Sequence, residues 1–253
     1  MKPHGHAAIV TGGASGLGAE TARALAAAGA KVAIFDKNAD LAASVASEID
    51  GIAIPCDVSS AASAVSAMSA ARRAHGVARI LVSCAGIGGS ARIVGKQGPM
   101  PLEQFERTIA VNLVGTFNMM RLAAHDMIVQ EPLDDGERGV IVSTTSVAAF
   151  EGQVGQAAYA ASKGGISSLT LPAARELAQF GIRVLAIAPG LFFTPLLGEL
   201  PPDVQASLAA SIPFPKRLGH ADEYARLVLH MIENLSLNGE VVRLDGALRL
   251  APR

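Results

Sequence analysis

Short, almost uninterrupted runs of apolar residues recur along the chain, and longer segments of helical periodicity separate them. Such apolar runs are typical of strands that helices cover on both faces, and the longer segments are typical of those helices. The expected strands are Ala7–Thr11, Val32–Asp36, Ile52–Cys56, Ile80–Cys84, Val140–Thr144, Arg183–Ala188 and Glu240–Leu244. The expected helices are Leu17–Ala28, Leu41–Glu48, Ala61–Ala74, Leu102–Ile128, Ala157–Phe180 and Asp222–Asn234.

This alternation predicts an α/β fold with a Rossmann-like, doubly wound parallel sheet of about seven strands and helices on both faces. No shift in composition and no internal repeat marks a second domain, so residues 1–253 are expected to form one. Two loops interrupt the rhythm, at Gly88–Pro101 and Glu131–Gly139. A third segment, Leu191–Pro215, contains prolines 195, 201, 202, 213 and 215 and cannot be one regular helix. Because it follows the carboxyl end of a strand, we expect it to be a lid over a site at that edge.

The composition of the chain argues against a nucleic-acid-binding protein and against a membrane protein. Half of the residues are hydrophobic, only 17% are charged, and the mean hydropathy is +0.37, which indicates a thoroughly buried sheet or extensive subunit contacts. The net charge of −1, without a long basic run, argues against nucleic acid as a partner. Cys56 and Cys84 are expected to be free thiols in a reducing compartment. With no signal sequence before the first strand, and prolines and Arg183 interrupting the apolar stretch 182–197, we expect a cytoplasmic rather than a membrane protein.

A glycine turn follows the first expected strand. It reads Thr11-Gly12-Gly13-Ala14-Ser15-Gly16-Leu17-Gly18 and leads into a helix, the context in which such a pattern predicts dinucleotide binding. Glycines let the backbone turn sharply and approach a pyrophosphate, whose charge faces the helix N-terminus. The Ser15 hydroxyl could donate to a phosphate. A plain tight turn is the alternative, and the features below disfavour it.

The second strand ends at Asp36, eighteen residues after Gly18. A carboxylate at this position can accept both ribose hydroxyls of NAD and would repel the 2′-phosphate of NADP. Lys37 follows but is the weaker signal, so the sequence favours NAD.

Two further strand ends are candidates for cofactor contact. Asp57 and Val58 follow the third strand and could hold the adenine amine. A helix N-cap is an equally good interpretation of Asp57, although Ser59 and Ser60 fit that cap role better. Cys84, Ala85 and Gly86 follow the fourth strand, and their small size permits close approach of the cofactor.

Tyr159 and Lys163 lie one helical turn apart on the same face of an expected helix. A phenol with an ordinary pKa of about 10 needs a shift of about 3 units, or about 4 kcal/mol, to ionise near neutrality. A lysine cation about 5 Å away supplies about 3 kcal/mol at an effective dielectric constant of about 20. Lysine alone therefore nearly suffices, and the positive ring of NAD⁺ could provide the rest in the oxidising direction. The pair therefore predicts a general acid and base for interconverting an alcohol and a ketone, with Lys163 also able to bind the nicotinamide ribose.

Two more polar residues complete this candidate site. Ser146 follows the fifth strand, thirteen residues before Tyr159, and could polarise the substrate oxygen; Ser143, Thr144 and Thr145 offer similar hydroxyls nearby. Asn112 is a polar residue inside an apolar helix, either a satisfied core amide or the anchor of a water that relays protons to Lys163. Two cysteines and six scattered histidines offer no convincing zinc ligand set, so a metal-free proton donor is expected.

The glycine turn, Asn112, Ser146, Tyr159, Lys163 and Pro189-Gly190, in this order, resemble the classical short-chain dehydrogenase/reductase family over essentially the whole chain. The resemblance implies a catalytic tetrad of the four polar residues, with Pro189, Gly190, Phe192 and Thr194 beside the nicotinamide. Ser83-Cys84-Ala85-Gly86 departs from the Asn-Asn-Ala-Gly usual in the family.

Within that family, residues 146–159, 188–192, 213–215 and 238–247 look like those of members that oxidise 3-hydroxyacyl-CoA to 3-ketoacyl-CoA with NAD. This likeness implies a homotetramer acting in fatty acid metabolism, with Gln153 near the substrate carbonyl and the loop Gly88–Pro101 near the thioester or its CoA. Substrate contacts are then expected from Ser146, Gln153 and Tyr159.

Other activities remain open on the same scaffold. A 3-ketoacyl-carrier-protein reductase is one, although Asp36 counts against its NADPH, and a steroid or small-alcohol dehydrogenase is another. A regulator that senses the dinucleotide without chemistry is the non-enzymatic alternative. The complete tyrosine–lysine pair disfavours it.

Overall fold

The structure, a computed structural model, describes residues 1–194, 197 and 201–252. Seven parallel strands form one sheet in the order β3-β2-β1-β4-β7-β8-β9. The strands are β1 (Ala7–Thr11), β2 (Lys31–Asp36), β3 (Ile52–Pro55), β4 (Ala78–Ser83), β7 (Gly139–Thr144), β8 (Ile182–Pro189) and β9 (Val241–Leu244). The predicted doubly wound parallel sheet is confirmed, with boundaries that move by one or two residues.

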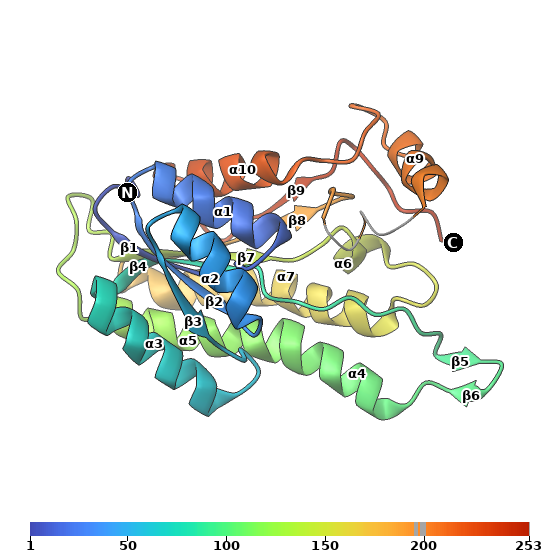
Figure 1. The fold of residues 1–253 in the computed structure, drawn as a ribbon, viewed down its shortest axis with the longest axis horizontal. Helices are drawn as coiled ribbons and strands as arrows, with labels where there is room; N and C mark the ends of the chain where they lie inside the picture. Colours follow the sequence, from blue (N-terminus) through green and yellow to red (C-terminus); the bar gives the residue numbers. More distant parts are fainter. Residues whose placement is uncertain (195–196, 198–200, 253) are drawn as a thin grey trace.

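Helices cover both faces of this sheet (Figure 1). Both faces of the central strands are buried, which explains their nearly continuous apolar sequence. One layer contains α1 (Gly16–Ala27), α2 (Ala39–Glu48) and α10 (Ala221–Glu233). The other contains α3 (Ala61–His75), α4 (Leu102–Ile109), α5 (Gly115–Met127) and α7 (Ala157–Ala178).

The strand order reverses at β1, and this fixes where a ligand can enter. Val10 of β1 pairs with Ile34 of β2 on one side and with Val82 of β4 on the other. The connections therefore leave in opposite directions from β1, and a crevice opens between them at the carboxyl ends of the strands. The glycine turn lies at this switch point.

The helix expected at Leu102–Ile128 is interrupted. Between α4 and α5 the chain makes a π-helical turn, η1 (Ala110–Val114), in which Asn112 is completely buried. Such turns are rare and frequently mark functional sites. Hydrophobic periodicity does not reveal this one, because the apolar face continues through it.

Short helices and strands occur in three of the connecting segments. These segments are Gly88–Pro101, the connection between β7 and α7, and Leu191–Pro215. The loop Gly88–Pro101 carries a small antiparallel hairpin of β5 (Val94–Gly95) and β6 (Gly98–Pro99). The short helix α6 (Ala148–Glu151) follows β7, and α9 (Pro202–Ala210) lies within Leu191–Pro215. Pro195 falls outside the described residues.

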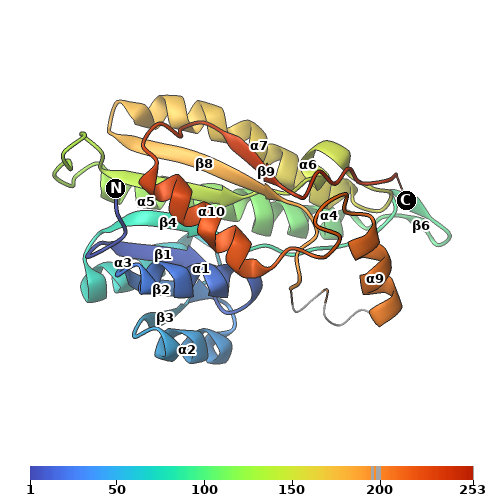
Figure 2. The same ribbon diagram turned by 90° about the horizontal axis from the view of Figure 1, so that it is seen from above.

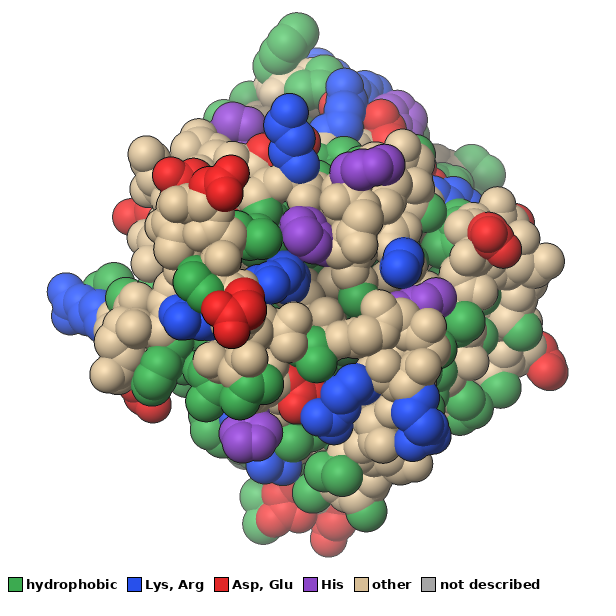
Figure 3. All heavy atoms as spheres, turned by 90° about the vertical axis from the view of Figure 1, so that its left-hand side faces the viewer, with side chains coloured by type: hydrophobic (Ala, Val, Ile, Leu, Met, Phe, Trp, Pro, Cys, Tyr) green, Lys and Arg blue, Asp and Glu red, His purple; other side chains and the backbone are tan. Residues whose placement is uncertain are grey.

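These additions gather at one end of the molecule. Figure 2 shows α9, the hairpin and the C-terminus at the end toward which the strands run, whereas the N-terminus lies at the other end. Figure 3 looks onto that other end, where basic, acidic and histidine side chains are intermixed. The site residues described next lie at the carboxyl end of the sheet.

Candidate active site

The glycine turn between β1 and α1 packs closely against the end of β4. Gly12 has a φ of +66°, and a Cβ atom there would lie 2.6 Å from the backbone nitrogen of Ala85. A Cβ atom at Gly18 would collide with the carbonyl oxygen of Gly12. Ser15 is exposed and does not cap α1 with its side chain, so its hydroxyl and the first N–H groups of the helix are open to a phosphate. These residues fit a dinucleotide pyrophosphate, and Gly16 and Leu17 continue the turn into the helix.

Asp36 is fixed beside this turn. Its Oδ2 accepts from the Ala14 N–H at 3.1 Å, and its Oδ1 accepts from the Asn38 N–H at 2.9 Å. Each carboxylate oxygen keeps further capacity to accept a hydrogen bond from a ribose hydroxyl. The following cation, Lys37, is paired with Asp57, Nζ to Oδ2, at 3.0 Å. This arrangement suits the two free hydroxyls of an NAD ribose better than a 2′-phosphate.

The structure decides whether Asp57 caps the N-terminus of α3. Ser60 is the N-cap of α3, so Asp57 is not. The Asp57 carboxylate instead accepts from the Ser59 hydroxyl at 2.6 Å and the Ser59 N–H at 3.0 Å, and these bonds, with Lys37, lower its pKa. The carbonyl of the adjacent Val58 accepts from the Asn118 side chain at 2.8 Å, which anchors this strand end.

The hydroxyls that follow β7 have different partners. The Ser143 hydroxyl is buried and makes no hydrogen bond within the described residues. The Thr145 hydroxyl donates to the Lys163 carbonyl at 2.7 Å. The Ser146 hydroxyl is hydrogen-bonded to the Tyr159 phenol. Of the four hydroxyls that follow one another here, Ser146 is therefore the one beside the Tyr159 phenol.

Thr144 contacts the ammonium of Lys163 through its backbone. Its carbonyl accepts from Lys163 Nζ at 2.8 Å. Consecutive residues at the end of β7 thus hold both the backbone and the side chain of Lys163, as well as the Tyr159 phenol. The relevant part of α7 is fixed to the sheet by hydrogen bonds in addition to apolar packing.

Burial dominates the electrostatics of the Tyr159–Lys163 pair. Lys163 Nζ lies 5.7 Å from the centroid of the Tyr159 ring. Burial lowers the pKa of Lys163 to about 8, so it remains mostly cationic at pH 7. Burial also raises the pKa of Tyr159 above its ordinary value, against the opposing effect of the Ser146 hydrogen bond. The energy estimate made from the sequence did not include the desolvation of the phenolate, and this desolvation opposes ionisation of Tyr159 in the protein alone.

Asn112 has the geometry of a satisfied core amide. Its Oδ1 accepts from the Ile87 N–H at 2.8 Å, and its Nδ2 donates to the Ile87 carbonyl and the Ser162 hydroxyl, both at 3.0 Å. It thereby holds the chain just after Cys84-Ala85-Gly86, and a Cβ atom at Gly86 would lie 3.3 Å from Asn112 Oδ1. The same Cβ atom would lie 3.6 Å from Lys163 Nζ, so Gly86 lies close to both the Asn112 amide and the Lys163 ammonium.

Pro189 and Gly190 lie between the site, β9 and the segment that begins at Leu191. The Pro189 carbonyl accepts from the Val147 N–H at 3.1 Å. Gly190 lies so close to Asp245 that a Cβ atom there would be 2.8 Å from the Asp245 Cβ. Phe192 is buried, and the half-buried Thr194 follows two residues later.

Gln153 lies in the connection between α6 and α7. Its Nε2 donates to the Ala251 carbonyl at 2.9 Å, and the carbonyl of Pro252 accepts from the Val154 N–H at 3.0 Å. The C-terminal segment therefore lies against this connection.

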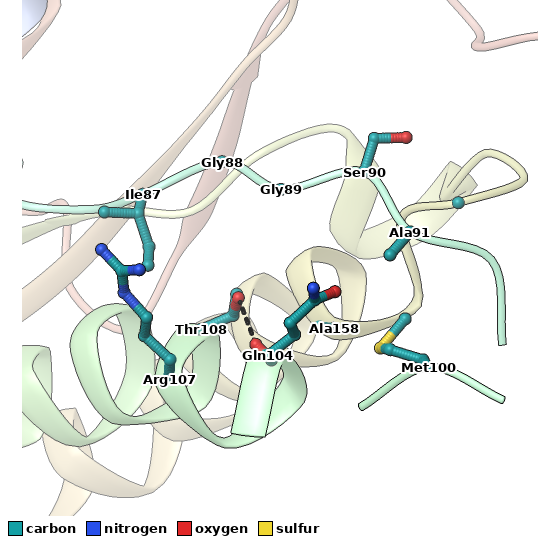
Figure 4. Close-up of a pocket in the computed structure, with 11 residues that line it drawn as sticks. Ile87, Gly88, Gly89, Ser90, Ala91, Met100, Gln104, Arg107, Thr108 and Ala158 are labelled. Carbon is teal, nitrogen blue, oxygen red and sulfur yellow. Dashed lines mark hydrogen bonds between the residues drawn. The ribbon is translucent and has the colours of Figure 1, made fainter. Parts of the chain in front are cut away.

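A hollow of about 370 Å³ opens beside the connection after β4. In Figure 4 the chain from Ile87 to Ala91 forms one side, and Gln104, Arg107 and Thr108 of α4 form the other. The dashed line marks the hydrogen bond that Thr108 Oγ1 donates to the Gln104 carbonyl at 3.1 Å. A second hollow of about 370 Å³ includes Gln153 in its lining.

Among the described residues, no group of three or more His, Cys, Asp or Glu side chains could hold a metal ion. No helix in the described part of the chain is long and apolar enough to cross a membrane.

Sequence reasoning missed two groups near the site. One is Tyr224 of α10, whose hydroxyl lies 2.7 Å from Thr144 Oγ1; a tyrosine within an apolar helix face signals a buried partner for its hydroxyl. The other is an ion-pair network in which Arg243 contacts Glu151 at 2.8 Å and Asp245 at 2.7 Å. It ties α6 to β9, and no local pattern in the sequence signals it.

Comparisons with known proteins agree with this geometry. Residues 6–205 match the family model described as short chain dehydrogenase. The chain is 51% identical to 3-hydroxyacyl-CoA dehydrogenase type-2 of Bos taurus over 98% of this chain and 97% of that protein.

Two solved structures are also similar over nearly their whole length. A 3-hydroxyacyl-CoA dehydrogenase type-2 from Mycobacterium avium has a TM-score of 0.94 and 42% identity, covering 100% of both chains. A 7α-hydroxysteroid dehydrogenase complexed with NADH and 7-oxo glycochenodeoxycholic acid has a TM-score of 0.88 and 31% identity, covering 98% of this chain and 96% of that one. The chain belongs to the short-chain dehydrogenase family. It is therefore an oxidoreductase.

Proposed function

We propose that this enzyme interconverts 3-hydroxyacyl-CoA and 3-ketoacyl-CoA with NAD(H). The observation that carries the proposal is the convergence of Ser146, Tyr159 and Lys163 beside a glycine turn that fits a dinucleotide. The substrate class is supported by the 51% identity to a 3-hydroxyacyl-CoA dehydrogenase type-2 over almost the entire chain.

The mechanism assigns one task to each polar residue. In the oxidising direction the Tyr159 phenolate takes the proton of the substrate hydroxyl, and hydride leaves the same carbon atom as the C=O bond forms. Ser146 donates a hydrogen bond to the substrate oxygen, and Asn112 holds the site in place through the chain after β4. NAD⁺, when bound, accepts the hydride, and NADH returns it in the reverse direction.

Lys163 stabilises the phenolate. Its ammonium is mostly protonated at pH 7, because its pKa is about 8, and it also suits the hydroxyls of the nicotinamide ribose. The cost of burying the phenolate would be offset in part by the positive charge of the nicotinamide ring when NAD⁺ is bound. Reduction uses the neutral phenol of Tyr159 as the proton donor.

Cofactor contacts are assigned to residues around the crevice. The glycine turn would hold the pyrophosphate and Asp36 the adenosine ribose. The remaining contacts would come from Asp57, Val58, Cys84, Ala85, Gly86, Tyr159, Lys163, Pro189, Gly190, Phe192 and Thr194.

The substrate would enter beneath residues 191–215, which we propose act as a lid. Support comes from α9, in which no residue is buried, and from the position of the segment directly after β8. Gln153 would contact the substrate near its carbonyl, and the loop 88–101 would lie near the thioester or its CoA.

We further propose a homotetramer in the cytoplasm that acts in fatty acid metabolism. Half-exposed apolar side chains on η1, α5 and α7 support subunit contacts: Val114, Phe117 and Leu171. The two free cysteines suit a reducing compartment. Sedimentation equilibrium tests the assembly, and a monomer at micromolar concentration would contradict it.

A substrate panel tests the proposed function. The purified protein is assayed with NAD⁺ and 3-hydroxyacyl-CoA of increasing chain length, with 2-methyl-branched, carrier-protein and steroid alcohols alongside. We expect the highest kcat/KM on a CoA thioester and a preference for NAD⁺ over NADP⁺. Higher kcat/KM on a carrier-protein thioester or on a steroid would overturn the proposed substrate class.

A further inference from the structure

Tyr224 connects the two helical layers that flank the sheet. It belongs to α10, whereas Lys163 belongs to α7 in the opposite layer. The Tyr224 side chain is completely buried. Its hydroxyl lies 2.7 Å from Thr144 Oγ1 and 3.7 Å from Cys84 Sγ, so its polar end reaches the last residue of β7.

Thr144 is hydrogen-bonded at both its side chain and its backbone. The side chain contacts Tyr224, and the carbonyl accepts from Lys163 Nζ at 2.8 Å. The next N–H, that of Thr145, donates to the Ile187 carbonyl of β8 at 2.8 Å. The orientation of this peptide group therefore depends on the sheet on one side and on the Tyr224 hydroxyl on the other.

The Lys163 ammonium depends on this carbonyl because it lacks an opposite charge. Within the described residues Lys163 makes no ion pair, and the titratable groups that face it are Tyr159 on its own helix and Cys84, which directly follows β4. Burial raises the pKa of Cys84 as well as that of Tyr159, so both are neutral at pH 7. A buried cation without a counterion is stabilised by the dipoles that point at it.

We propose that Tyr224 is a positioning residue: its hydroxyl, acting through Thr144, orients the carbonyl that holds the Lys163 ammonium. The consequence for turnover rests on the proposed function, in which Lys163 stabilises the Tyr159 phenolate. The consequence for Lys163 itself does not, because it concerns contacts within the protein alone.

A purely structural role for Tyr224 is the competing explanation. Its ring packs edge-on against Phe192, with centroids 6.5 Å apart and planes at 86°. Substitution by phenylalanine keeps this packing and removes only the hydroxyl. Tyr224→Phe therefore separates the two roles, and Thr144→Val removes the same hydrogen bond from the other side.

Thr170→Val is the matched control. Thr170 is also a buried hydroxyl residue, and it lies on α7 with Lys163, but its hydroxyl donates only within the helix, to the Ile166 carbonyl at 2.9 Å. No hydrogen bond joins it to Thr144 or Tyr224 in the described part of the structure. Losing this hydroxyl lowers stability without altering the position of Lys163.

The test is an NMR titration of ¹³Cε-labelled lysine in the cofactor-free protein. The chain has six lysines, and Lys163 is distinguished by its pKa of about 8. We expect Tyr224→Phe and Thr144→Val each to lower this pKa further, by about 0.5 units or more, because the ammonium loses part of its stabilisation. The shift in the double variant should be smaller than the sum of the two single shifts, since both changes remove the Tyr224–Thr144 hydrogen bond, and Thr170→Val should match the wild type.

Kinetics supply the second readout. With a less stabilised ammonium, the kinetic pKa for oxidation should rise, and kcat at pH 7 should fall about fivefold or more with little change in KM. A merely structural role would lower activity at every pH without moving this pKa. Thr144→Ser keeps the hydroxyl and should restore the Lys163 titration.

An unchanged Lys163 titration in folded Tyr224→Phe and Thr144→Val would overturn the proposal. If Tyr224→Phe does not fold, Thr144→Val decides by the same criterion. Failure of the wild type to oxidise any 3-hydroxyacyl-CoA would instead overturn the proposed function and leave the titration to decide the role of Tyr224.

Discussion

The ammonium of Lys163 lies 5.7 Å from the centre of the Tyr159 ring, one helical turn further along α7, and neither group has a charged partner in the described part of the protein. Burial is the largest influence on the pKa of each group. Lys163 loses part of its basicity, with a pKa of about 8, and the pKa of Tyr159 is raised. In the proposed function, the positive ring of bound NAD⁺ would favour the phenolate form of Tyr159.

The first prediction concerns this acidity. Burial raises the pKa of both tyrosines in the chain, Tyr159 and Tyr224. Ultraviolet absorbance should therefore show no phenolate below pH 10 in the cofactor-free protein, and the absence of tryptophan keeps the spectrum simple. Phenolate absorbance near pH 7 to 8 without NAD⁺ would contradict the dominance of burial.

The second prediction concerns the stability cost of the buried cation. Lys163→Met should abolish turnover and raise the free energy of unfolding at pH 7 by about 1–3 kcal/mol, after the loss of the hydrogen bond to Thr144. The folded-state pKa of about 8 lies below the ordinary 10.5, so between these values the unfolded wild type binds more protons and its stability rises with pH.

Urea unfolding at pH 7 and at pH 10 measures this difference. The advantage of Lys163→Met should be largest at pH 7 and should shrink toward pH 10. A variant that is less stable than the wild type at pH 7, or an advantage that does not change with pH, would show that burial of Lys163 is not costly.

The third prediction compares two serines at the end of β7. Ser146→Ala removes the hydroxyl beside the Tyr159 phenol and should lower kcat/KM about 100-fold or more. Ser143→Ala removes a buried hydroxyl that has no hydrogen-bond partner in the described structure, so it should leave kcat/KM and stability nearly unchanged. Steady-state kinetics on both variants make the comparison, and equal losses would remove the distinction between the two hydroxyls.

The fourth prediction concerns cofactor choice. Asp36→Ala should weaken NAD⁺ binding about tenfold or more, because hydrogen bonds from ribose hydroxyls to a carboxylate are lost, and it should reduce the discrimination against NADP⁺. Asp40→Ala is the control, since Asp40 is an exposed acidic residue in the first turn of α2. Isothermal titration with both cofactors measures the effect, and unchanged selectivity in Asp36→Ala would refute the assigned role.

The sequence predicts the fold and the proximity of Tyr159 and Lys163 because both follow from local rules. The spacing of apolar residues and the turn-forming residues between them predict the strands. Residues four positions apart lie on the same helix face, which predicts that Lys163 lies beside Tyr159. The π-helical turn at Asn112 follows no such rule. Its apolar face continues the helical period, and only the tertiary hydrogen bonds to Ile87 and Ser162 account for the conformation.

Contacts across the sheet could not be predicted in the same way. Tyr224 and Thr144 are 80 residues apart and come from different layers, so their hydrogen bond depends on the packed structure. The pKa of Tyr159 differs from expectation for the same reason, since desolvation depends on every element that covers the phenol.

The most direct test of the account is the activity of Tyr159→Phe, which keeps the ring and removes only the phenolic hydroxyl. Oxidation of 3-hydroxybutyryl-CoA should fall about 1,000-fold or more across the pH range, while NADH binding, followed by fluorescence, should stay within about threefold of the wild type. Turnover within about tenfold of the wild type, with NADH still bound, would contradict the role of Tyr159 as the acid and base.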